Sequence, residues 1–177
     1  MMRTLFLLLF FTSFLMTSFA QKGNPEQKAA IKKMQWLIGD WRGTSTVLVD
    51  GLKRITNIKE SVQTALDGTI LQITVRATDK DSSTRLQSLA YTSFSVISYD
   101  IKKQVYRWTT WRNNGNDYDQ YPFTVGDNFF EYTSENNDGK VRYKGMLGSK
   151  GEFLETGEFL KKDSWQQFIN MKLIKSK

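Results

Sequence analysis

The side chains that could bind a small molecule gather in the second half of the chain, where aromatic residues and arginines occur together. In the stretch VYRWTTW, residues 105–111, the even-numbered and odd-numbered side chains lie on opposite faces of an expected strand. The sequence alone does not show which face points inward, because a shift of one residue exchanges the two faces. We predict six ligand-binding residues in this region: Tyr106, Arg107, Trp108, Trp111, Tyr132 and Tyr143.

Aromatic residues spread over several expected strands suit an apolar cavity, because small-molecule sites are lined by apolar side chains with a few polar groups. The phenol groups would supply hydrogen bonds to a ligand. Aromatic residues at alternate strand positions are also the ordinary filling and cross-strand pairs of a sheet, so both interpretations stay open for each residue. The set comprises Trp108, Trp111, Tyr121, Phe123, Phe129, Phe130, Tyr132 and Tyr143.

Arg107 and Arg142 are candidates for a guanidinium that faces an anionic headgroup of a ligand. Each has a tyrosine beside it in the sequence, Tyr106 and Tyr143, which must lie on the opposite face of its strand. The alternative is an arginine on a wet outer face, which the rarity of unpaired buried cations favours.

Histidine and cysteine are absent from the sequence, which removes the usual general base near neutral pH, thiolate nucleophiles and the commonest metal ligands. Glu155 and Glu158 point to opposite faces of one expected strand. Asp117 and Asp119 share a face, but they lie beside an Asn-Gly loop where solvated acids are expected. No phosphate-binding loop or serine nucleophile motif occurs. We therefore predict no catalytic residue, no metal site, no cofactor and no enzymatic activity.

Residues 1–20, MMRTLFLLLFFTSFLMTSFA, have the features of a secretory signal peptide. A cation at Arg3 precedes an apolar run over 5–11, and the small residues Ser18 and Ala20 precede the expected cleavage site. An uncleaved anchor is the alternative, but hydroxyl-bearing residues interrupt the apolar run before it reaches the roughly 20 residues that a membrane span needs. We predict export to the periplasm or the extracellular space.

The segment after the predicted cleavage site, residues 21–177, has the length of a single domain. Cleavage removes one of the 25 basic residues and none of the 18 acidic ones, which leaves a net charge of +6. Because charges of both signs alternate along the chain, we interpret them as a solvated surface and predict no nucleic-acid partner and no stable membrane insertion after processing; attraction to nucleic acid or anionic lipid is the alternative. An exported domain without cystines also indicates a bacterial protein.

A helix is predicted over 25–38, at the start of this domain. Asn24 is the expected N-cap, with Pro25 in the first helical position and Gln27 completing a capping box. Apolar residues follow at helical spacing. Gly39 suits the left-handed position that ends a helix.

From Trp41 onward the apolar pattern has period two and turn signals recur at short intervals, which is typical of an antiparallel sandwich or barrel. Because nearly every connection has hairpin length, we predict an all-β, antiparallel up-and-down barrel of about ten strands whose one end is closed by the N-terminal helix. The predicted strands cover 41–49, 52–66, 69–77, 85–92, 94–99, 104–111, 118–125, 128–134, 140–147, 152–160 and 166–174. The predicted turns cover 50–51, 67–68, 79–83, 100–103, 113–116, 126–127, 136–139, 149–151 and 161–164.

The tripeptide GDW, Gly39 to Trp41, resembles the G-x-W signature that opens the first strand of lipocalins and their calycin relatives. With LIGDWRGTS, YDIKKQVYRWTTWRNNG and DSWQQFINMKLIKSK, the chain resembles a bacterial family of uncharacterised secreted lipocalin-like domains, distantly related to nitrobindin and the fatty-acid-binding proteins. The resemblance implies that Trp41 closes one end of a barrel and packs against a cation of the last strand, Lys172 or Lys175. Nitrobindin-like haem binding does not carry over, because this chain lacks the histidine that would ligate the iron.

The resulting hypothesis is an exported protein that holds a small hydrophobic or amphipathic molecule inside the barrel, since a barrel of this size leaves room for one small ligand. The alternative is a structural or interaction protein of the cell envelope, with a filled barrel and no ligand. The interior volume separates these two hypotheses. An enzyme that uses Tyr, Asp or Glu is the least favoured hypothesis.

We predict that the mature protein begins at Gln21, because Ser18 and Ala20 occupy the small-residue positions before a signal-peptidase cut. Intact-mass measurement of the exported product should show the loss of residues 1–20. Retention of these residues would contradict the prediction.

Overall fold

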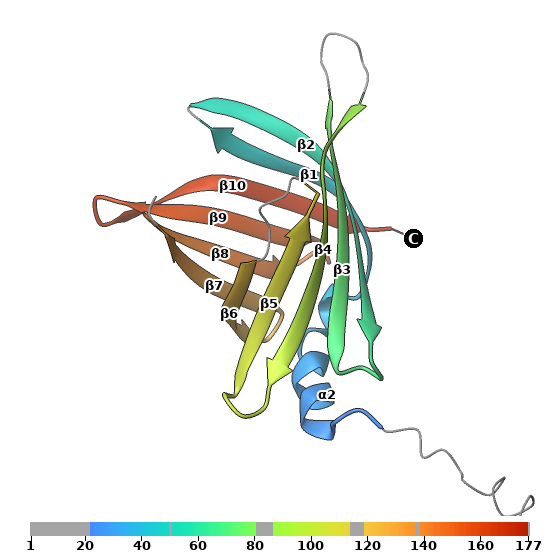
Figure 1. Ribbon diagram of the computed structural model, residues 1–177. Coiled ribbons are helices and arrows are strands. Elements are labelled where there is room, and N and C mark those ends of the chain that lie inside the picture. The colour runs from blue at the N-terminus through green and yellow to red at the C-terminus, as the bar shows by residue number, and fades with distance from the viewer. Residues whose placement is uncertain (1–21, 50, 81–86, 114–118, 137–138, 177) are drawn as a thin grey trace, which may run out of the picture.

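The computed structural model describes residues 22–49, 51–80, 87–113, 119–136 and 139–176. Within these residues, ten antiparallel strands form a closed up-and-down barrel, as predicted, and β1 pairs with β10 to close it (Figure 1). The elements are α2 (Pro25–Lys32), the 3-10 helix η2 (Gln35–Leu37), β1 (Gly39–Val49), β2 (Leu52–Ala65), β3 (Ile70–Lys80), β4 (Gln87–Asp100), β5 (Val105–Arg112), β6 (Asp119–Gly126), β7 (Phe129–Asn136), β8 (Gly139–Leu147), β9 (Phe153–Lys161) and β10 (Ser164–Lys175).

Several predicted features fall wholly or partly on residues that the structure does not describe. The predicted signal peptide, residues 1–20, lies outside the described residues, as do parts of the turns predicted at 50–51, 79–83, 113–116 and 136–139. The other predicted turns all fall between consecutive paired strands, so the turn chemistry located these hairpins correctly.

The two strands predicted at 85–92 and 94–99 are wrong, because β4 runs through both without a turn. The pairing of β4 with β3 shifts register where Ala77 pairs with Tyr91 and Thr78 pairs with Leu89. Such a bulge adds one residue to one strand and breaks the strict alternation of faces. The extra residue in this shift is Ala90, and β4 continues through the predicted break at residue 93 to Asp100.

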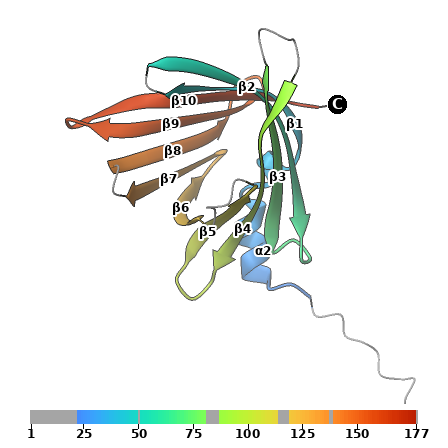
Figure 2. The same cartoon turned by 45° about the horizontal axis from the view of Figure 1, so that its top comes forward.

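The N-terminus of α2 forms as predicted. The side chain of Asn24 accepts hydrogen bonds from the backbone N–H groups of Glu26 (2.9 Å) and Gln27 (3.2 Å), and Pro25 takes the first turn. The expected capping box is not completed, because the Gln27 amide donates to the backbone carbonyl of Tyr99 instead. This bond ties the helix to β4, and the helix lies beside the ends of β3 and β4 (Figure 1 and Figure 2).

The predicted helix end at Ile38 is too late, since α2 ends at Lys32 and the chain continues through η2. The tighter 3-10 turn places Trp36 and Leu37 in the barrel core. Gly39 does not cap the helix; it is the first residue of β1 and has a φ of 134°, a backbone conformation that favours glycine.

Aromatic side chains fill the barrel at the end that the helix covers. Trp36 packs on Phe130 and Phe153, with ring centroids 6.3 and 5.8 Å apart, and Trp41 packs on Phe153 at 6.0 Å. We call these four residues the aromatic plug. The indole N–H of Trp41 donates to the Leu37 carbonyl at 2.7 Å, so this buried polar group is satisfied.

The spacing of Gly39 and Trp41 has a steric reason. The ammonium group of Lys175 lies 5.2 Å from the centre of the Trp41 ring, a cation–π distance, which confirms Lys175 as the predicted cation of the last strand. A Cβ atom at Gly39 would come within 2.4 Å of the Lys175 side chain. Glycine therefore leaves the space in which the lysine covers the tryptophan.

We predict that Trp41→Ala lowers the free energy of unfolding by about 3–5 kcal/mol, because the side chain is only 1% exposed and its removal leaves a cavity against Phe153. Denaturant unfolding measures the change. The matched variant Lys175→Met keeps the apolar stem and removes only the charge, so its loss should stay near about 0.5–1 kcal/mol. Equal losses from both variants would show that the tryptophan contributes little by burial.

Candidate functional site

The strand pairing settles which face of β5 points inward. Trp108 pairs with Ile97, and Thr110 pairs with Ser95; both partners on β4 are buried. The even-numbered side chains of β5 therefore face the interior, and the odd-numbered side chains face outward. Of the six residues predicted to bind a ligand, four lie on β5, and this rule separates them into an inward pair and an outward pair.

Tyr106 points inward but does not line the cavity described below. Its hydroxyl group donates to the backbone carbonyl of Ala30 at 2.9 Å, and its ring contacts Tyr99 and Phe123. Burial raises the pKa of the phenol, with a further contribution from Tyr99. Tyr106 thus holds α2 on the barrel end, and it is not among the residues that line the cavity.

Arg107 and Trp111, which were also predicted to bind a ligand, lie on the outer face of β5 and do not line the interior. Arg107 faces Asp100, with 3.5 Å between the side-chain nitrogen and oxygen. Trp111 stacks on Phe94 at 5.8 Å and is 42% exposed. The physical reason is the alternation of faces, which places both residues one position away from inward neighbours. Trp111 and Phe94 line a groove of about 790 Å³, whose lining also includes Glu60 and Arg112.

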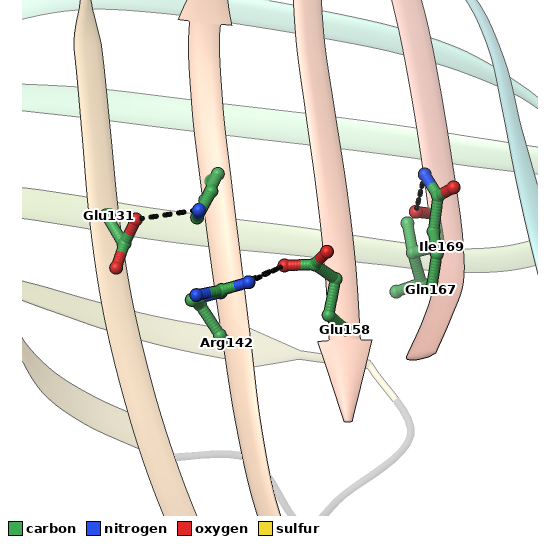
Figure 3. Close-up of polar contacts among 6 residues, drawn as sticks. Glu131, Arg142, Glu158, Gln167 and Ile169 are labelled. Carbon is green, nitrogen blue, oxygen red and sulfur yellow. Dashed lines mark hydrogen bonds and ion pairs between the residues drawn. The ribbon is translucent and has the colours of Figure 1, made fainter. Parts of the chain in front are cut away.

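Arg142 also lies on the outer face and does not face a ligand headgroup in the interior. Its guanidinium donates to the carboxylate of Glu158 at 2.6 Å across β8 and β9 (Figure 3). The same group lies 4.3 Å from the centre of the Trp165 ring. The charge of Arg142 therefore has two partners within the protein and needs no ligand, as is expected of a surface arginine.

The interior holds a cavity of about 190 Å³ next to the aromatic plug. Three of the six predicted ligand-binding residues line it: Trp108, Tyr132 and Tyr143. Tyr132 and Tyr143 are stacked cross-strand neighbours with centroids 4.9 Å apart, and Trp108 lies 6.0 Å from Tyr132. Trp108 also contacts Phe130 at 5.2 Å, so it joins the plug to the cavity wall.

Two carboxylic acids, Glu60 on β2 and Glu155 on β9, face the same cavity. Burial raises the pKa of Glu60 to about 8, with a further increase from repulsion by Glu155. Burial also raises the pKa of Glu155 to about 7. The neutral acid is therefore favoured in the folded state at pH values where an exposed glutamate is ionised.

Neither Glu60 nor Glu155 was predicted from the sequence to be a site residue. A signal for both was present, because each lies two residues from inward apolar positions: Glu60 between Ile58 and Val62, and Glu155 after Phe153. A charged side chain in register with an apolar face is unusual unless it is paired or functional.

Other polar groups on the cavity wall come from β4 and β5. The hydroxyl groups of Ser95 and Thr110 are 2.9 Å apart and hydrogen-bond each other. Tyr91 and Arg112 also line the cavity. Burial raises the pKa of Tyr91, and Glu155 and Glu60 raise it further, whereas Arg112 lowers it. The wall therefore combines aromatic rings with an acidic pair and one basic residue.

Comparison of the chain with family models and with curated protein sequences gives no match. Among the described residues, no helix is long and apolar enough to cross a membrane.

We predict that stability falls as the pH rises from about 5 to about 8.5. The folded state holds protons on Glu60 and Glu155 at pH values where the unfolded chain, with a carboxyl pKa near 4.5, has released them. The folded state binds more protons across this window, so raising the pH favours unfolding, by about 1.4 kcal/mol for each unit of pKa difference. Denaturant unfolding at several pH values measures the slope.

The variant Glu60→Gln should flatten this slope and be more stable than the wild type at pH 8.5. Glu158→Gln is the matched control, because Glu158 lies three residues from Glu155 on β9 but in the ion pair of Figure 3 on the outer face. It should retain the wild-type slope. A Glu60→Gln protein with an unchanged slope would show that Glu60 is not a buried titrating group.

Proposed function

We propose that the protein binds a small molecule in the interior cavity of the barrel. The observation that carries this proposal is the wall formed by Trp108, Tyr132 and Tyr143 around about 190 Å³ of interior space. The alternative hypothesis is a structural barrel whose side chains fill the interior, and such a barrel would not contain a cavity of this kind. Apolar rings with a few converging polar groups are the usual composition of a small-molecule site.

The volume limits the size of the ligand. Pockets for drug-sized molecules measure roughly 300–1,000 Å³, and this cavity is smaller. A compact amphipathic molecule with one ring or a short chain fits better than a long-chain lipid. The carboxyl groups of Glu60 and Glu155 at the wall favour a ligand that has at least one polar group as well as an apolar part.

Export and family membership belong to the same proposal. The sequence of residues 1–20 supports delivery to the periplasm or the extracellular space. A barrel that opens on a G-x-W tripeptide, with the tryptophan buried at the helix-covered end, supports a lipocalin-like relationship. We propose a binding role without catalysis, since no nucleophile motif or histidine accompanies the cavity.

Acid–base catalysis is a second candidate function, which Glu60 and Glu155 favour. Carboxyl groups with pKa values near neutrality act as general acids and bases in enzymes. A catalytic barrel would convert the molecule that it binds, whereas a binding barrel would release it unchanged. Mass spectrometry of the ligand after prolonged incubation with the protein separates the two functions.

We predict that a bound ligand raises the melting temperature, since a ligand at one hundred times its dissociation constant adds about 2.7 kcal/mol to the free energy of unfolding. Native mass spectrometry of the exported protein should reveal a retained small molecule. Thermal shift with a panel of small aromatic and short-chain amphipathic molecules should then show binding.

Trp108→Ala should abolish the thermal response, because Trp108 lines the cavity. Trp111→Ala is the matched control, since Trp111 lies on the same strand but on the outer face against Phe94. It should leave the response unchanged. If no molecule in the panel shifts the melting temperature and none is retained in the exported protein, the ligand-binding proposal fails.

A further inference from the structure

The two acids of the cavity differ from three other glutamates on or directly beside the barrel wall. Glu131, Glu152 and Glu158 each form an ion pair, with Lys144, Lys172 and Arg142 respectively. Among the described residues, neither Glu60 nor Glu155 has an ion pair or a side-chain hydrogen bond. This occurs in a chain with more basic than acidic residues, 25 against 18.

Leaving these acids without a basic partner costs stability, because a buried carboxyl group must stay neutral or ionise without compensation. Glu60 is only 8% exposed and lines the cavity, so this buried acid borders the space that a ligand would fill. A ligand with a positive charge would supply the basic partner that both carboxyl groups lack.

We propose that the ligand is a small organic amine whose ammonium group is held between Glu60 and Glu155 and whose apolar body packs on Trp108, Tyr132 and Tyr143. The inference rests on the proposed function, namely that the cavity binds a small molecule. It adds the charge and the chemical class of that molecule.

The aromatic wall suits a cation as well as an apolar body. An ammonium group is attracted to the faces of tryptophan and tyrosine rings, and the attraction increases when water is excluded. Trp108, Tyr132 and Tyr143 lie on the same cavity as the two acids. One molecule can therefore make both kinds of contact.

No other charged or titratable group on the cavity wall supplies the positive charge that we assign to the ligand. Arg112 lies close enough to Tyr91 to lower the pKa of that phenol, whereas the pKa values of Glu60 and Glu155 are set by burial and, for Glu60, by repulsion from Glu155. Arg112 therefore does not neutralise the acidic pair. The remaining titratable groups, Tyr91, Tyr132 and Tyr143, carry no positive charge.

An organic cation fits this site better than a metal ion or an anion. Among the described residues, no group of three or more acidic side chains that could hold a metal ion occurs, so no third carboxylate joins Glu60 and Glu155. An anion would meet the acidic pair without compensation. A neutral molecule would leave both carboxyl groups without a positively charged partner.

Binding of an amine should be linked to proton release. Below about pH 6 both acids hold their protons, and an ammonium group must displace at least one of them. At higher pH the acids ionise more readily and the amine gains its partners. Amine affinity should therefore rise with pH as long as the amine itself stays protonated.

The experiment compares amines with neutral molecules of the same shape. The pairs are butylamine and butanol, benzylamine and benzyl alcohol, 2-phenylethylamine and 2-phenylethanol, and tryptamine and tryptophol. Isothermal titration calorimetry at pH 5.5 and pH 8.5 measures each affinity. For at least one pair we expect the amine to bind at least tenfold more tightly than its alcohol at pH 8.5, with a smaller ratio at pH 5.5.

Glu60→Gln and Glu155→Gln should each reduce the preference for the amine at least tenfold while leaving the affinity for the alcohol unchanged. Glu158→Gln should bind like the wild type, because Glu158 lies on the outer face. Retained alcohol affinity in the two inward variants also shows that they are folded.

The outcomes separate the two proposals. Equal binding of amines and alcohols, or an amine preference that survives both inward substitutions, overturns the amine inference and leaves the cavity as a binding site. Calcium or magnesium that binds through Glu60 in place of the amines also overturns it. Absence of binding by every pair, with no molecule retained in the exported protein, overturns the proposed function as well.

Discussion

The pairing of β1 with β10 is the constraint on which the rest of the structure depends. It closes the sheet, so that every strand has an inner and an outer face. It brings Lys175 from the C-terminal strand to the Trp41 ring near the start of the barrel. It also places β2 and β9 on either side of the closing pair, and therefore turns Glu60 and Glu155 toward a common interior. An open sheet of the same strands would separate these two acids.

The two parts of the interior differ in composition: one is packed with apolar side chains, and the other surrounds a cavity with a partly polar wall. At the helix-covered end, the aromatic plug and Tyr106 exclude water, and the polar groups of Trp41 and Tyr106 find backbone carbonyl partners in the N-terminal segment. Next to this apolar layer, the wall changes to aromatic rings mixed with acids and hydroxyl groups around a cavity. The plug supplies burial that can offset the cost of the unpaired acids. This division resembles the general pattern in which stability is concentrated away from a strained or polar site.

The overall fold could be predicted because its determinants are local. Turn residues between alternating segments mark hairpins, Asn24 and Pro25 mark a helix start, and the absence of long connections favours an up-and-down barrel. Two predicted boundaries were wrong. β4 continues through the predicted break at residue 93, and the 3-10 turn of η2 keeps apolar spacing beyond the true end of α2. In both cases tertiary packing, which has no simple sequence signal, overrode the pattern.

The sequence by itself determined the strand content, the hairpin order, the burial of Trp41 and an aromatic second half that could surround a ligand. It did not determine which side chains point into the barrel. A shift of one residue exchanges the two faces of a strand, and both faces of β5 carry large side chains. Only the closed structure placed Trp108 inside and Arg107 and Trp111 outside. Only closure brought together Glu60 and Glu155, because their proximity arises from the pairing of the first and last strands and not from any spacing along the chain.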